Sequence, residues 1–199
     1  KRFLAPQHVV VDLVGDSKQK VADTIDLMSC AVSDANRTSI VMDLVTVYAK
    51  DKKAICFAQT KRAADELTAA LGRRVASEVL HGDIAQAQRE RTLQRFRDNR
   101  FSVLIATDVA ARGLDISDVD LVIHYELPND VESFVHRCGR TGRAGQLGAA
   151  IAMHTDREMY IIRRIKKETG CTFRTIGIPS STEVMDACAM TASNALKKV

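Results

Sequence analysis

The 199-residue chain contains no tryptophan, and aromatic residues make up only 5% of it. Proteins that hold single-stranded nucleic acid by base stacking need several aromatic side chains on one surface. A stacking platform is therefore not expected here. The chain also has no run of 18 apolar residues, so neither a membrane-spanning helix nor a membrane partner is expected.

Metal sites and disulfides are also poorly supported. The five cysteines are odd in number, and none of them lies in a CxxC pair. Isolated cysteines are typical of proteins from reducing, intracellular compartments, so we expect neither a disulfide framework nor a zinc site. Lys1–Gln7 lack the pattern of a signal peptide, and the absence of an initiator Met leads us to expect a longer parent protein.

The charge balance is mildly positive, with 29 basic and 25 acidic residues and a formal net charge of +4. This excess permits a partner that carries phosphates but does not require one. The arrangement of the arginines is more informative than their number, because the planar guanidinium fork suits phosphate oxygens.

Short β-branched runs alternate with longer amphipathic stretches, which predicts a parallel sheet covered by helices on both faces. The expected strands are His8–Val14, Ala54–Ala58, Val75–Leu80, Ser102–Ala106, Asp120–Tyr125, Gly148–His154 and, at an edge, Phe173–Ile176. The expected helices are Ser17–Ala49 with a break near Asp34–Thr38, a segment capped by Thr60 and ended by Gly72, Ala85–Asp98, Asn129–Cys138 and Asp156–Thr169. A weaker helix without a clear partner is expected between Pro179 and Val199.

The strongest functional motif is the octet HRCGRTGR at residues 136–143, which places Arg137, Arg140 and Arg143 at intervals of three. Two glycines so close together disfavour a helix interior. They suit a loop in which backbone and guanidinium groups approach an anion. An arginine held there can stabilise the charge that shifts in phosphoryl transfer. The alternative interpretation is a solvated basic turn.

A second motif, ATDVAARGLD at residues 106–115, directly follows an expected strand, where the functional loops of parallel sheets lie. Thr107 offers a hydroxyl to a phosphate, Gly113 permits close approach, and Asp115 can accept a hydrogen bond from a ribose hydroxyl. Taken alone, Asp108 and Asp115 could equally be ordinary turn formers.

Two further strand ends carry weaker signals. LHGD at residues 80–83 precedes a helix whose first turns carry Gln86 and Arg89, so backbone N–H groups and Arg89 could form a phosphate site. A plain joint with Asp83 as helix N-cap explains the same residues. In ICFAQTK at residues 55–61, Thr60 could be a helix cap, a nucleic-acid ligand or both.

These four blocks, in this order, resemble the second helicase domain of DEAD-box RNA helicases over roughly Val9–Ile178. HRCGRTGR is similar to the HRxGRxGR motif of that family, TDVAARGLD to its motif V, LHGD with QxxR to the HGD and QxxR elements, and CFAQTK to motif IV. GIPSSTEVMDA most resembles the nucleolar and plant-organelle branch. The resemblance implies an α/β fold in three layers, a RecA-like parallel sheet sandwiched between helices. Residues 1–178 would form this domain, and residues 179–199 a helical extension or linker.

The resemblance also implies a role for each motif residue. The catalytic residues would be Arg140 and Arg143, as arginine fingers on the ATP γ-phosphate, and His136, which would couple the nucleotide to RNA. Gly113 and Asp115 would meet the nucleotide ribose. The residues expected along RNA are Thr60, Gly82, Asp83, Arg89, Thr107 and Arg112, the last also at the domain interface. Contacts to the backbone and the 2′-hydroxyls imply little sequence specificity and a preference for RNA over DNA.

The chain has neither a GxxxxGK[ST] phosphate loop nor a DEAD box. The resemblance therefore implies that ATP and Mg²⁺ are held by an N-terminal RecA-like domain outside these residues, and no metal site is expected in the chain itself. The implied function is that of one half of an ATP-dependent RNA helicase. It would close on the N-terminal domain to complete ATP hydrolysis and RNA unwinding, and it would be inactive alone. Cys138, at the variable position of the octet, needs no catalytic role.

Two other hypotheses stay open at this point: half of a DNA translocase, and a non-enzymatic binding module with vestigial motifs. The complete motif set disfavours the first, and intact Arg140, Arg143 and Asp115 disfavour the second. We expect an intracellular location, with nucleolus, chloroplast and mitochondrion as alternatives. The expected partners are RNA and the chain's own N-terminal domain, and the C-terminal tail could promote a dimer.

Overall fold

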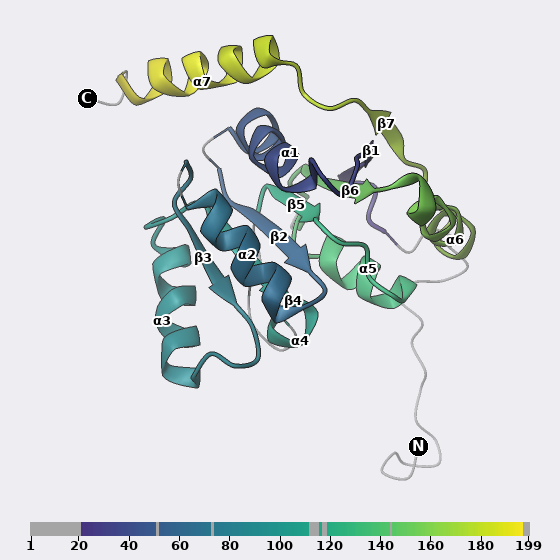
Figure 1. The fold of residues 1–199 in the computed structure, drawn as a ribbon, viewed down its shortest axis with the longest axis horizontal. Coiled ribbons are helices and arrows are strands. Elements are labelled where there is room, and N and C mark those ends of the chain that lie inside the picture. The colour runs from purple at the N-terminus through teal and green to yellow at the C-terminus, as the bar shows by residue number, and fades with distance from the viewer. Residues whose placement is uncertain are drawn as a thin grey trace.

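The computed structural model describes residues 21–50, 52–72, 74–111, 116, 119–143 and 145–196. Within these residues, seven strands form one parallel sheet in the order β3-β4-β2-β5-β6-β1-β7 (Figure 1). The strands are β1 (Ile25–Ala31), β2 (Ala54–Ala58), β3 (Ser77–Leu80), β4 (Val103–Thr107), β5 (Leu121–His124), β6 (Gly148–His154) and β7 (Arg174–Ile176). The α-helices are α1 (Arg37–Leu44), α2 (Lys61–Leu71), α3 (Gln86–Arg97), α4 (Asp108–Ala111), α5 (Val131–Cys138), α6 (Met159–Thr169) and α7 (Ser181–Leu196). Two short turns complete the set, the π-helical η1 (Val45–Ala49) and the 3-10 helical η2 (Asp156–Glu158).

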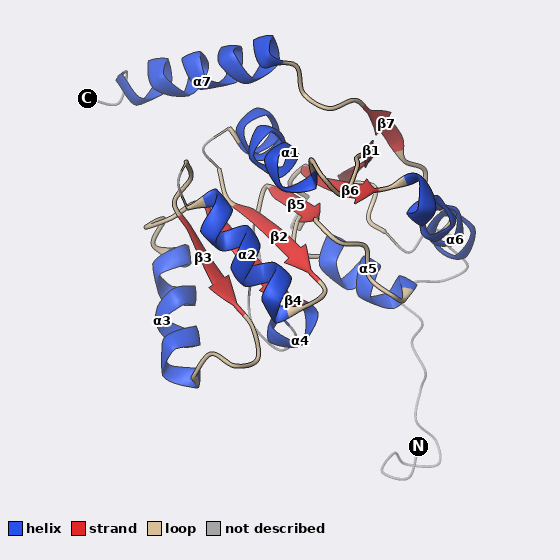
Figure 2. Cartoon of the chain, viewed as in Figure 1, coloured by secondary structure: helices blue, strands red, loops and turns tan. Residues whose placement is uncertain are grey.

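The sheet separates two hydrophobic clusters. Successive side chains of a strand point to opposite faces, so Ile55 and Phe57 of β2 enter one cluster and Cys56 enters the other. The first cluster is completed by side chains of α3, α5 and α6, and the second by side chains of α1 and α2. Every residue of β2 and β4 is buried, as expected for central strands covered on both faces. The three-layer α/β architecture is therefore confirmed (Figure 2).

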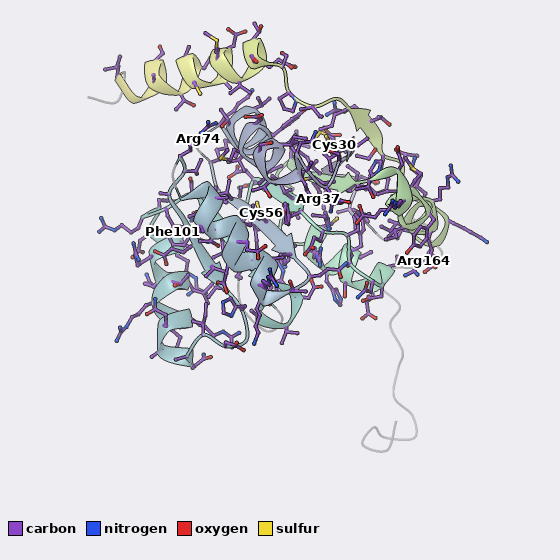
Figure 3. All side chains as sticks on the ribbon, in the orientation of Figure 1. Cys30, Arg37, Cys56, Arg74, Phe101 and Arg164 are labelled. Atoms are coloured by element: carbon purple, nitrogen blue, oxygen red, sulfur yellow. The ribbon has the colours of Figure 1, made fainter. Side chains whose placement is uncertain are left out.

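Side chains sort between the core and the surface as this layering requires (Figure 3). Cys56 is fully buried in the sheet, whereas Arg164 of α6 lies on the surface. Arg37 is an exception, because it is a charged side chain that is only 6% exposed. It lies at the start of α1.

The helix expected over Ser17–Ala49 is wrong in its first part. Residues 25–31 form β1, which pairs in parallel with β6 on one side and β7 on the other. The segment IDLMSCA has few β-branched residues, so its local propensity for a strand is weak, and pairing with two neighbours decides its structure. The second part is helical from Arg37 to Ala49, after a turn within the expected break. The strand expected at His8–Val14 lies outside the described residues.

The helix expected after Pro179 is present as α7, but the expectation that it has no clear partner is wrong. α7 packs beside η1 on the α1 side of the molecule (Figure 1), where Ala187 is buried. Its other faces expose Met185, Met190 and Leu196. Among the described residues, none of the helices has the length and apolar character to cross a membrane.

Candidate nucleotide and nucleic-acid interface

Three of the motifs end at one edge of the sheet. Thr60 follows β2, Gly82 and Asp83 follow β3, and Thr107 ends β4. These strands are direct neighbours in the order β3-β4-β2. Because they run parallel, their carboxyl ends lie side by side, in the position where the ligands of open α/β sheets bind. We call this set, with Arg89, the carboxyl-edge residues.

An exposed ion pair joins the motif that follows β2 to the motif that follows β3. Lys61 Nζ lies 2.5 Å from Asp83 Oδ2, and this hydrogen bond and charge lower the pKa of Asp83 and raise that of Lys61. The alternative in which Asp83 is the N-cap of the following helix is wrong. α3 begins at Gln86 after Ala85, without a side-chain cap. Thr60, in contrast, is the N-cap of α2, because its side chain accepts a hydrogen bond from the backbone N–H of Ala63 at 3.1 Å.

Arg89 of α3 contacts the motif that follows β4. Its Nη2 donates a hydrogen bond of 3.0 Å to the carbonyl oxygen of Ala110 in α4. Its Nε is buried and has no hydrogen-bond partner among the described residues. The guanidinium is thus held close to the segment that follows Thr107.

Two glycines of the motifs are not explained by the fold. A Cβ atom on Gly82 would meet nothing within 4 Å, and one on Gly139 would make only ordinary contacts, 3.5 Å from the nearest atom. Neither residue has a positive φ. Since neither packing nor backbone conformation requires glycine there, both positions suit the close approach of an outside group to the backbone.

The octet HRCGRTGR begins in α5 and ends beyond it. α5 leads from the carboxyl end of β5 back to the start of β6, so Arg140 and Arg143 lie away from the carboxyl-edge residues. Arg140 Nη1 contacts the carbonyl oxygen of Ile116 at 3.5 Å. Arg143 Nε donates to the carbonyl oxygen of Gly139 at 2.6 Å. Arg140 and Arg143 are thus on one short turn, which we call the arginine loop (residues 139–143).

The three arginines of the octet are evenly spaced but not equivalent. The Arg137 side chain is only 1% exposed and forms a two-point ion pair with Asp108, with Nε–Oδ1 at 2.6 Å and Nη2–Oδ2 at 2.8 Å. Its Nη1 donates to the carbonyl oxygen of Glu126 at 2.7 Å, and its guanidinium lies 5.0 Å from the centre of the Phe57 ring. The Arg137 guanidinium is therefore bound by groups of the domain itself. The neighbouring His136 side chain is 57% exposed and faces Glu132 at 3.9 Å.

The side chains of His124 and Cys138 form a buried, uncharged pair. His124 stacks on Phe134 with ring centroids 4.4 Å apart, and its Nε2 lies 3.5 Å from Cys138 Sγ. Burial, together with the charge of Arg137, holds the pKa of His124 well below its usual value. Burial also raises the pKa of the Cys138 thiol. Cys138 is thus a packed core residue, out of reach of a ligand at the arginine loop.

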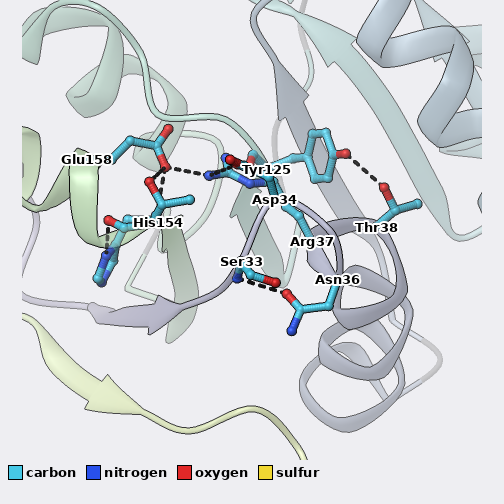
Figure 4. Close-up of polar contacts among 9 residues, drawn as sticks. Ser33, Asp34, Asn36, Arg37, Thr38, Tyr125, His154 and Glu158 are labelled. Carbon is cyan, nitrogen blue, oxygen red and sulfur yellow. Dashed lines mark hydrogen bonds and ion pairs between the residues drawn. The ribbon is translucent and has the colours of Figure 1, made fainter.

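Sequence reasoning missed a second buried arginine. Arg37 donates from Nη1 to the carbonyl oxygen of Tyr125 at 2.8 Å and from Nη2 to Glu158 Oε2 (Figure 4). Glu158 also caps the turn that begins at Thr155, through the Thr155 backbone N–H at 2.7 Å. A lone arginine at the start of an amphipathic segment gives no sequence signal for such burial, because its partners lie far away in the chain.

Some expected site residues cannot be placed. Arg112, Gly113 and Asp115 lie outside the described residues, so the expected ribose contacts and one RNA contact stay predictions. Among the residues that are described, no group of three or more His, Cys, Asp or Glu side chains is placed to hold a metal ion.

The comparisons with known proteins agree on one family. The model of the helicase conserved C-terminal domain matches residues 36–145, more than half of the chain. The chain is 52% identical over 181 residues to the DEAD-box ATP-dependent RNA helicase 3B, chloroplastic, of Zea mays, which covers 91% of this chain and 24% of that protein. It is 56% identical over 165 residues to the DEAD-box ATP-dependent RNA helicase 9, mitochondrial, of Arabidopsis thaliana, which covers 83% of this chain and 27% of that protein. The chain thus spans about a quarter of the length of these relatives.

A solved structure shows the same arrangement of strands and helices. S. cerevisiae Dbp5 bound to RNA and ADP BeF3 superposes with a TM-score of 0.76 at 29% identity, over 86% of this chain and 46% of that one. The motif order, the sheet and these matches agree: the chain belongs to the helicase conserved C-terminal domain family, and the relatives that it matches are DEAD-box RNA helicases.

Proposed function

We propose that this chain is the C-terminal RecA-like half of an ATP-dependent RNA helicase. It closes on an N-terminal RecA-like domain to complete ATP hydrolysis and RNA duplex unwinding, and it has no ATPase activity alone. Residues 1–178 form the helicase domain in this proposal, and residues 179–199 begin a helical extension. The family match, the relatives' names and the placement of the motif residues support it.

The arginine loop carries the proposal. Arg140 and Arg143 lie on one short turn, where Arg143 Nε donates a hydrogen bond of 2.6 Å to the Gly139 carbonyl oxygen. The turn is fixed to the start of β1 by a hydrogen bond of 2.7 Å from Thr24 Oγ1 to the Gly142 carbonyl oxygen. A fixed turn with two cations suits the γ-phosphate of ATP, on which arginine fingers stabilise developing charge. Arg140 and Arg143 take that role here.

The remaining nucleotide contacts divide between two domains. Gly113 and Asp115 meet the ribose, and the exposed His136 reaches the N-terminal domain and couples the nucleotide to RNA. ATP and Mg²⁺ are held mainly by that N-terminal domain, where Mg²⁺ neutralises phosphate charge.

The carboxyl-edge residues form the RNA side. Thr60, Gly82, Asp83, Arg89, Thr107 and Arg112 line the RNA backbone. A Cβ atom on Gly82 would meet nothing within 4 Å, so the backbone there is accessible, and the Arg89 Nε has no hydrogen-bond partner among the described residues. Such contacts read phosphates and sugars rather than bases, so we propose little sequence specificity. S. cerevisiae Dbp5, which superposes on this chain, is bound to RNA in its structure.

The test is Arg140→Ala in the full-length protein. We expect RNA-stimulated ATP turnover to fall by about 10³-fold, the lower end for an arginine finger, while RNA affinity changes little. Arg163→Ala, at an exposed arginine of α6, is the matched control and keeps full activity. Unchanged turnover in the Arg140 variant would show that the finger assignment is wrong.

Two further measurements address the rest of the proposal. The 199-residue chain by itself should show no ATP turnover, and adding the N-terminal domain should restore it. RNA should stimulate the full-length ATPase more than DNA of the same sequence does. Equal stimulation would favour a DNA translocase instead.

We also propose an organellar or nucleolar location and a dimer contact on α7. The relatives include chloroplastic and mitochondrial proteins, and α7 exposes the apolar side chains of Met185, Met190 and Leu196. Light scattering of the full-length protein, with Met190→Glu and Leu196→Glu, tests the dimer. A monomer at micromolar concentration would contradict it.

A further inference from the structure

Asp108 and Arg137 lie between the two proposed binding regions. Asp108 directly follows Thr107, a carboxyl-edge residue, and it begins α4, whose Ala110 carbonyl oxygen accepts the hydrogen bond of Arg89. Arg137 directly follows His136 and precedes the arginine loop by two residues. The ion pair thus connects the segment expected at RNA to the helix that carries the residues expected at ATP.

The geometry of the pair makes this connection stiff. Both guanidinium nitrogens that face Asp108 are bonded, at 2.6 and 2.8 Å. A planar two-point contact fixes orientation as well as distance. The third contact, from Nη1 to the Glu126 carbonyl oxygen, ties the same guanidinium to the loop after β5. A shift of α4 must therefore either move α5 or break the pair.

The neighbours of the pair extend the link to the other carboxyl-edge residues. The Glu126 carboxylate accepts a hydrogen bond of 2.7 Å from the backbone N–H of Gln59, next to Thr60. A small hollow is lined by Asp108, His136, Arg137 and Arg140, among others, so the pair and the expected nucleotide residues face the same space. Asp108 is 28% exposed, whereas the Arg137 side chain is only 1% exposed. A group that binds at the surface can therefore displace Asp108.

We propose that Asp108 and Arg137 are positioning residues that couple RNA binding at the carboxyl edge to the placement of Arg140 and His136 at ATP. The inference rests on the proposed function and adds how its RNA site and its ATP site are linked within the domain. Neither residue contacts RNA or nucleotide. RNA bound beside Thr107 fixes α4, the ion pair transmits that position to α5, and the arginine loop is set for the γ-phosphate.

The coupling between two ligands is measurable as a ratio of affinities. If RNA and nucleotide bind cooperatively, the RNA Kd falls by some factor when a non-hydrolysable ATP analogue is added, typically about 5- to 150-fold for coupled sites. The experiment measures this ratio in the full-length protein with Asp108→Asn, which removes the charge but keeps the shape. We expect the ratio to fall toward one, with the RNA Kd without nucleotide within about twofold of wild type. Asp108→Glu, which keeps the carboxylate, should recover part of the ratio.

A purely structural role of the pair predicts a different result. Glu158→Gln is the matched control, because it removes the carboxylate partner of the other buried arginine, Arg37 (Figure 4). It should lower the unfolding temperature and leave the coupling ratio unchanged. Loss of thermal stability in Asp108→Asn with an unchanged ratio would overturn the proposal.

A second variant tests the proposal if Asp108→Asn folds poorly. Arg137→Lys keeps the positive charge but cannot make the two-point contact, and it should lose coupling as Asp108→Asn does. Normal coupling in Arg137→Lys would overturn the proposal. A ratio of one in the wild-type protein would contradict the proposed function itself and the coupling with it, which separates this failure from failure of the pair alone.

Discussion

Thr24 and Gly142, 118 residues apart, are joined by a hydrogen bond of 2.7 Å from Thr24 Oγ1 to the Gly142 carbonyl oxygen. Gly142 has a φ of +68°, and a Cβ atom on it would lie 2.5 Å from Ile25 Cγ1. The turn that carries Arg143 is thus shaped by the segment at the start of β1 as well as by its own sequence. Of the two octet glycines, Gly142 is the one that the fold requires.

Gly142→Ala should therefore destabilise the domain. The left-handed backbone costs about 1–2 kcal/mol for alanine, and overpacking against Ile25 costs about 1–3 kcal/mol, so we expect about 2–5 kcal/mol in total. Because the chain has no tryptophan, urea unfolding is followed by far-ultraviolet circular dichroism. Gly139→Ala is the matched control, with its φ of −65° and a change within about 0.5 kcal/mol. Equal losses in both variants would contradict the packing argument.

Thr60 can be tested for its two roles separately. Asp is as good an N-cap as Thr, so Thr60→Asp should keep α2 stable. If Thr60 lies along RNA, the new carboxylate should weaken RNA binding by about fivefold or more, since two like charges 4 Å apart in water repel by about 1 kcal/mol. Fluorescence anisotropy with labelled single-stranded RNA measures the affinity.

Two controls frame that result. Thr60→Ser keeps both cap and hydroxyl and should bind RNA normally. Thr60→Ala should lose about 1 kcal/mol of unfolding free energy through the cap. Unchanged RNA affinity in a well-folded Thr60→Asp variant would leave Thr60 as a cap alone.

Arg89 should contribute to the salt dependence of RNA binding. A phosphate contact releases bound cations, and each contact adds about 0.7 to the slope of log Kobs against log salt for a single strand. Arg89→Gln in the full-length protein should therefore lower that slope by about 0.7. Arg91→Gln, an exposed arginine of the same helix, should leave it unchanged. The same slope in both variants would remove Arg89 from the RNA side.

The sequence predicts this sheet well where strands are buried on both faces. β2, β4 and β6 combine apolar runs with clear turn signals, so their residues point to strands by themselves. β1 does not, because IDLMSCA owes its strand to pairing with β6 and β7, which come more than a hundred residues later. Local propensity cannot report such a partner.

The site divides in a similar way. Thr60 and Thr107 were found because they lie at strand ends, and the octet because of its spaced arginines and glycines. Spacing could not separate Arg137 from Arg140 and Arg143, since that difference comes from Asp108, on another element. The Asp83 N-cap alternative failed for the same reason: Lys61, on α2, takes its carboxylate.

His124 should make the stability of the domain depend on acidity. Its pKa in the folded state lies well below its usual value because the ring is buried beside Arg137, whereas the unfolded chain has a value of about 6.5. The unfolded state thus binds the proton that the folded state excludes. The full stability is present above a pH of about 6.5, and it is lost as the pH falls toward the folded pKa, by up to about 1.4 kcal/mol per pH unit.

Urea unfolding between pH 7 and pH 5 should show this slope in the wild-type chain. His124→Gln and His124→Phe should both lose the slope, even though their stabilities at pH 7 differ. A wild-type slope that persists in both neutral variants would assign the acid sensitivity to other groups.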